Sequence, residues 1–95
     1  LVAAGKLDDA LATLEAANHV NPGDVSVLQE LVELAVELGD HTAVARHLTS
    51  LADLMSGSRR GNALVELAEL YYDHLDDSAR ARQSMRAAAA AGTQA

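Results

Sequence analysis

Residues 5–22 read GKLDDALATLEAANHVNP, and residues 39–56, which lie 34 positions further along the chain, read GDHTAVARHLTSLADLMS. Each segment starts with a glycine, and apolar residues follow that glycine at the same offsets. The matched pairs are Ala10 with Val44, Leu14 with Leu48, Ala17 with Leu51 and Val20 with Leu54. A fixed period of this length is typical of proteins built from repeated units, so the chain contains one structural unit more than once.

The repeated unit is expected to be helical, because its apolar residues recur at steps of three and four, the spacing of one helix face. Capping and helix-breaking residues then divide the chain into five expected helices. The first ends at Asn21-Pro22-Gly23, the second is capped by Asp24 and ends at Gly39, the third is capped by Thr42 and runs to Leu54, the fourth runs from about Asn62 to Leu75, and the fifth is capped by Asp77 or Ser78 and ends at Gly92. Residues 56–61, SGSRRG, form the longest expected connector. Strand patterns are absent.

A third, looser copy of the unit follows two or three inserted residues in this connector. It aligns Ala81, Met85 and Ala88 with Val44, Leu48 and Leu51. Asp76 then stands where the first two copies have glycine. The inserted residues fall in a loop, where repeat proteins tolerate them.

Two helices in 34 residues resemble the tetratricopeptide repeat, most closely at Gly5-Lys6-Leu7-Asp8-Asp9-Ala10 followed by Leu14, Ala17 and Pro22. The resemblance covers nearly the whole chain, as a partial first repeat (1–22), a second (23–56) and a third (57–92). Residues 1–4 would be the tail of a helix that turns at Gly5. The resemblance implies an all-α fold in which antiparallel helical hairpins stack as a short right-handed superhelix of about five helices. Departures from the family pattern occur at Val44, Leu51, Ser56 and Asp76.

Composition narrows the possible functions. The 95 residues are 49% hydrophobic and 2% aromatic, with a formal net charge of -7 and no cysteine. The charge and the lack of a basic stripe disfavour nucleic-acid binding, and no apolar run is long enough to cross a membrane. The chain does not begin with Met and reads as a fragment. The sequence does not determine the cellular compartment, although the cytoplasm is weakly favoured. Its high alanine content, its preference for arginine over lysine and its lack of cysteine favour a bacterial source.

No pattern indicates catalysis, a metal or a cofactor. None of the four histidines is spaced from another metal-ligating residue as in a preformed ligand pair; the nearest case, His74 with Asp77, is a weak one. Asp73, His74, Asp76 and Asp77 are dense enough to suggest a hard cation, but they lack the loop order of an EF-hand, and helix capping explains them more simply. Phosphate-binding loops and nucleophile elbows are also missing. We therefore expect a protein that is not an enzyme.

The first helix of each hairpin is the expected binding element, since proteins that resemble this repeat commonly hold a peptide or helix on that inner face. In the second expected helix the face comprises Gln29, Glu33, Val36 and Glu37. In the fourth it comprises Glu66, Leu70, Asp73 and His74, or Val65, Glu69, Tyr72 and Asp73 if the inserted residues shift the register by one. Either set is acidic, so the expected partner is a basic or apolar segment of a protein, unless the face is only a solvated surface.

Two other roles stay open at this point. Residues 1–45 carry eight acidic residues against Lys6 alone, whereas residues 46–95 carry six acidic residues and six arginines. Because repeat units bury their apolar stripes only against neighbours, exposed repeat ends could associate with a second chain. Arg80, Arg82 and Arg86 could then meet an acidic end of a neighbouring copy. The chain could also be a regulatory appendage of a larger protein.

Overall fold

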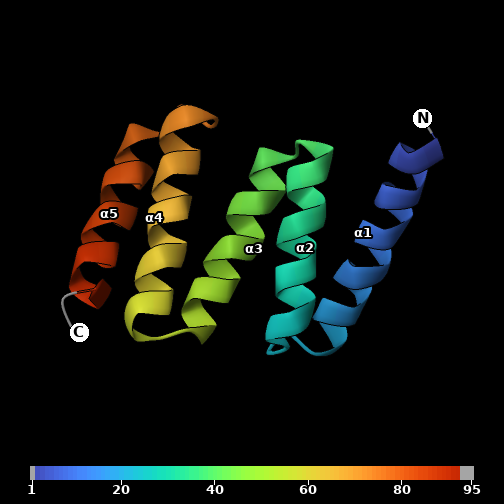
Figure 1. The fold of residues 1–95 in the computed structure, drawn as a ribbon, viewed down its shortest axis with the longest axis horizontal. Coiled ribbons are helices and arrows are strands. Elements are labelled where there is room, and N and C mark those ends of the chain that lie inside the picture. Colours follow the sequence, from blue (N-terminus) through green and yellow to red (C-terminus); the bar gives the residue numbers. More distant parts are fainter. Residues whose placement is uncertain (1, 93–95) are drawn as a thin grey trace.

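The computed structural model describes residues 2–92, which form five α-helices and no strand. The helices are α1 (Val2–Val20), α2 (Val25–Leu38), α3 (His41–Leu54), α4 (Gly57–Asp73) and α5 (Ser78–Gly92). Each helix packs on the helices before and after it in the chain, and Figure 1 shows them side by side in chain order. The expected all-α stack of antiparallel hairpins is confirmed. No helix in the described part of the chain is long and apolar enough to cross a bilayer.

Helix α2 begins and ends as its sequence predicts. A side-chain oxygen of Asp24 accepts a hydrogen bond from the Val27 amide at 3.3 Å, which satisfies an amide that has no partner within the helix. At the other end Gly39 has φ 72°, and the amide of Asp40 donates to the carbonyl of Ala35 at 3.0 Å. This left-handed cap turns the chain sharply into α3.

The predicted turn at Gly5 is wrong, because α1 runs through this residue as one helix from Val2 to Val20. Residue 1, part of the predicted helix tail, lies outside the described residues. A glycine permits a turn but does not require one, and inside a helix it costs only about 1 kcal/mol. The neighbouring Ala3 and Ala4 are the residue type with the highest helix propensity.

The predicted cap of α3 at Thr42 is also wrong. Asp40 is the cap, and its side chain accepts from the Ala43 amide at 3.1 Å. Because Gly39 has already turned the chain, the next residue can begin the new helix, and an aspartate is among the best residues for that position. Helix α5 is capped in the same way, since a side-chain oxygen of Asp77 accepts a hydrogen bond from the Arg80 amide at 3.0 Å. The alternative of Asp77 as the cap of α5 is therefore confirmed.

The predicted connector at residues 56–61 is mostly helix. Helix α4 begins at Gly57, which has φ 62°, and only Met55 and Ser56 separate it from α3. Gly61 is buried inside α4. The glycines that suggested flexibility thus lie at the start of a helix and at a buried helical position.

The core lies where α2, α3 and α4 meet. Leu28, Leu31 and Ala35 of α2 are completely inaccessible to solvent. Met85 was expected to be the counterpart of Leu48 in the core, but the structure differs: Leu48 is 4% exposed and Met85 is 50% exposed. Helix α4 packs on α3, whereas no helix among residues 2–92 packs on the far side of α5.

Candidate partner-binding surfaces

Helix α2 exposes all four of its predicted binding residues. Gln29, Glu33, Val36 and Glu37 are exposed, and Val36 keeps 60% of its surface accessible. Their exposure follows from the helical period, because Leu28, Leu31 and Ala35 turn the opposite side of the helix into the core. An exposed valine with acidic residues on both sides is the most distinctive feature of this helix.

Helix α4 follows the alternative register. Leu70 is only 9% exposed and belongs to the core, so its assignment to the binding face is wrong. Val65 and Tyr72 are 36% and 70% exposed, and Glu69 and Asp73 are exposed beside them. Relative to the 34-residue period, two residues are therefore inserted before the buried positions of α4, and a third is inserted after them. The buried Leu64 and Leu67 accordingly lie 36 positions after Leu28 and Leu31, whereas Asp77 lies 37 positions after Asp40.

Equivalent positions of successive repeats point to the same side of a helical array. Several exposed pairs obey the 36-residue offset, and three of them define what we call the α2–α4 face: Glu33 with Glu69, Val36 with Tyr72, and Glu37 with Asp73. Each repeat thus places one large apolar side chain between two carboxylates.

A groove of about 410 Å³ lies at the junction of α2, α3 and α4. It brings together Gln29 and Glu66, which the sequence predicted as binding residues on different helices. Sequence reasoning missed its remaining lining residues, Leu48, Leu51, Met55, Arg59, Asn62 and Ala63. Arg59 was missed because residues 56–61 were taken as a loop. The groove combines an apolar floor with polar side chains.

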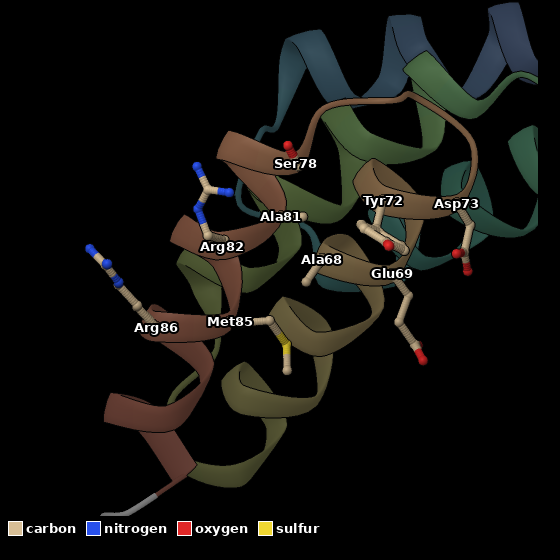
Figure 2. Close-up of a pocket in the computed structure, with 9 residues that line it drawn as sticks. All are labelled: Ala68, Glu69, Tyr72, Asp73, Ser78, Ala81, Arg82, Met85 and Arg86. Atoms are coloured by element: carbon tan, nitrogen blue, oxygen red, sulfur yellow. The ribbon is translucent and has the colours of Figure 1, made fainter.

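The other predicted residues do not converge on this groove. Glu33 and Glu37 line a hollow of about 620 Å³ between α1 and α2, together with Glu30 and the apolar Leu14 and Leu34. Asp73 lines a third hollow, between α4 and α5, which Figure 2 shows. The α2–α4 face is thus an extended surface with several depressions rather than one pocket.

The histidines are dispersed among different structural contexts. His47 is 4% exposed, and its Nε2 lies 3.5 Å from Oε2 of Glu15 without making a hydrogen bond. Burial and the adjacent Arg46 lower the pKa of His47, and the Glu15 carboxylate only partly offsets them. The rings of His41 and His74 stack with centroids 4.1 Å apart. No group of three or more potential metal ligands occurs among the described residues.

Comparison with known proteins gives one match. A family model described as Tetratricopeptide repeat matches residues 1–54, which is more than half of the chain and ends at the last residue of α3. No curated protein and no solved structure shows a significant match.

Proposed function

Because the chain belongs to the tetratricopeptide repeat family, we propose that it holds a segment of a partner protein on its α2–α4 face. Repeats of this family generally mediate protein–protein interaction, and its members are typically scaffolds without catalytic activity. We propose the same for this chain. The observation that carries the proposal is the row of exposed Val36 and Tyr72 between carboxylates on successive repeats.

The chemistry of this face selects the kind of partner. Four carboxylates, from Glu33, Glu37, Glu69 and Asp73, would repel an acidic segment and attract lysine or arginine. Neither α2 nor α4 carries a cation on this face to receive a terminal carboxylate. Val36 and Tyr72 offer apolar contact, which supplies affinity that salt does not screen. The preferred partner is a segment that alternates apolar and basic residues.

The groove at the junction of α2, α3 and α4 would add specificity. Gln29 and Asn62 supply both donors and acceptors, so they can bind the backbone of an extended segment. Arg59 and Glu66 lie in the same groove and would favour a polar or charged side chain at that point of the partner.

The test measures the binding of fluorescently labelled peptides to the chain by fluorescence anisotropy. A twelve-residue peptide of leucine and lysine is compared with one in which glutamate replaces lysine. We expect binding of the basic peptide only, weakened about tenfold or more when Glu33 and Glu37 are both changed to lysine, which corresponds to about 1.4 kcal/mol.

The matched control changes Asp8 and Asp9 of α1 to lysine. Both residues are exposed, and the change in net charge is identical. Equal weakening by the two double variants would show that only overall charge matters, and the proposal would then be wrong.

A further inference from the structure

The groove between α4 and α5 has a volume of about 650 Å³ and a mainly apolar floor. Ala68 of α4 and Ala81 of α5 form its floor, and the small side chains leave room between the helices. Met85 points into the groove from α5, and Tyr72 lies over it from α4 (Figure 2). These two large side chains are 50% and 70% exposed, so the groove offers apolar surface that the hairpin itself does not cover.

The two rims of this groove carry opposite charge. Glu69 and Asp73 lie on the α4 rim, whereas Arg82 and Arg86 lie on the α5 rim. The residues of each pair are four positions apart, which is about one helical turn. Within residues 2–92 none of the four forms an ion pair, so all four are available to an outside partner.

The preceding hairpin shows what changes at this surface. On α3, Ala45 and Leu48 are each 4% exposed, because α4 packs over them. Their counterparts on α5, 37 positions later, are Arg82 and Met85. A helix that covered α5 with a purely apolar face, as α4 covers α3, would bury the guanidinium of Arg82 without a partner, which is strongly unfavourable. The surface therefore fits an occupant that brings carboxylates opposite Arg82 and Arg86, cations opposite Glu69 and Asp73, and an apolar centre.

We propose that this occupant is a second copy of the same groove, related by a two-fold axis that runs parallel to α4 and α5. Such an axis lays α4 of one copy over α5 of the other, and the reverse. The acidic rim then meets the basic rim twice, and Tyr72 and Met85 of both copies meet at the centre. A surface that is its own complement is what a two-fold interface requires.

The order of the charged residues along the hairpin agrees with this axis. Helices α4 and α5 are antiparallel, so moving away from the turn between them leads from Asp73 to Glu69 on one rim and from Arg82 to Arg86 on the other. Both rims advance by one helical turn in the same direction. A two-fold axis parallel to the helices preserves that direction, and the two rows can therefore pair residue by residue.

The contact area is that of one helical hairpin, so the dimer is expected to be weak, with a dissociation constant on the order of micromolar. Tyr72, Glu69 and Asp73 belong to both this groove and the α2–α4 face. Dimerisation and partner binding would therefore compete at α4, but the inference does not rest on the proposed function.

The test is sedimentation velocity across a concentration series, with two charge-reversal variants of the 95-residue chain. In the first, Glu69 and Asp73 become arginine, and in the second, Arg82 and Arg86 become glutamate. We expect the unaltered chain to form a salt-sensitive dimer and each variant alone to be a monomer. An equimolar mixture of the two variants should form a heterodimer, because each basic rim then faces an acidic rim.

The matched control changes Arg59 and Arg60 to glutamate at the exposed start of α4, away from the groove, and should leave the dimer intact. A chain that stays monomeric at all concentrations overturns the proposal, as does a dimer that both variants retain or a mixture that stays monomeric. Circular dichroism of each variant checks its helical content. The peptide experiment uses Glu33 and Glu37 on α2, so a loss of peptide binding and a loss of dimer are separate results.

Discussion

Asp76 adopts, with φ 50°, the left-handed conformation that Gly39 adopts with φ 72° one repeat earlier. Each of these residues directly precedes the aspartate that caps the next helix, Asp40 or Asp77. The chain thus places a residue with positive φ before the capping aspartate twice, once with glycine and once without it. Aspartate is among the few residues other than glycine that visit this conformation at modest cost.

This relationship predicts a stabilising substitution. Asp76→Gly removes the steric cost of the left-handed conformation, roughly 1 kcal/mol, against a smaller loss from the freer unfolded chain, so the free energy of unfolding should rise by a few tenths of a kcal/mol. Gly39→Ala should lower it by about 1 kcal/mol, because nothing obstructs the added methyl group and only the backbone strain remains. Urea unfolding followed by circular dichroism measures both. A destabilised Asp76→Gly variant would show that the aspartate side chain itself holds the turn.

The repeat period made the stack of hairpins predictable, because apolar spacing fixes which side of each helix is buried. The register of α4 was harder to predict from the sequence. The inserted residues are divided between its two ends, so Leu64 follows a 36-residue offset and Asp77 a 37-residue offset, and no single shift aligns both. Met85 was misplaced for another reason: whether an apolar residue is covered depends on the next helix in the stack, which its own periodicity does not reveal.

A second prediction separates the observed cap of α3 from the one that the sequence favoured. Asp40→Ala removes the hydrogen bond to the Ala43 amide and should lower the free energy of unfolding by about 1 kcal/mol. Thr42→Ala should change it by less than about 0.5 kcal/mol, since Thr42 is exposed inside the helix and alanine is the better helix former. Thermal unfolding of the two variants side by side decides the matter, and the reverse ranking would restore Thr42 as the cap.

The buried His47 predicts a dependence of stability on pH. Its pKa in the folded chain is lowered from 6.5, mainly by burial and also by Arg46, so the unfolded chain binds a proton more readily than the folded chain does. Stability from this residue is present above about pH 6.5 and falls as the pH drops below it, by at most about 1.4 kcal/mol per pH unit. His47→Gln should flatten the profile between pH 6.5 and 5.5, measured by urea unfolding.

The control for this pH dependence is His19→Gln, because His19 is exposed on α1. That variant should keep the slope of the unaltered chain. Glu15→Gln should steepen the slope, since the Glu15 carboxylate is a cause that raises the pKa of His47 and partly offsets burial. An unchanged slope in His47→Gln would assign the pH dependence to other groups.

The last prediction concerns Leu31 and Met85, two large apolar side chains with different environments. Leu31 is fully buried, so Leu31→Ala should cost about 3 kcal/mol from lost burial and the cavity left behind. A domain of this size has only about 5–14 kcal/mol of stability, so the variant should melt at a much lower temperature. Met85 is half exposed, and Met85→Ala should cost less than about 1 kcal/mol when the chain is dilute.

At concentrations where the dimer forms, the same Met85→Ala variant should lose stability relative to the unaltered chain, because Met85 lies at the centre of the proposed interface. Differential scanning calorimetry at two concentrations distinguishes these contributions, and a cost for Met85→Ala that is large at both would place Met85 in the core after all.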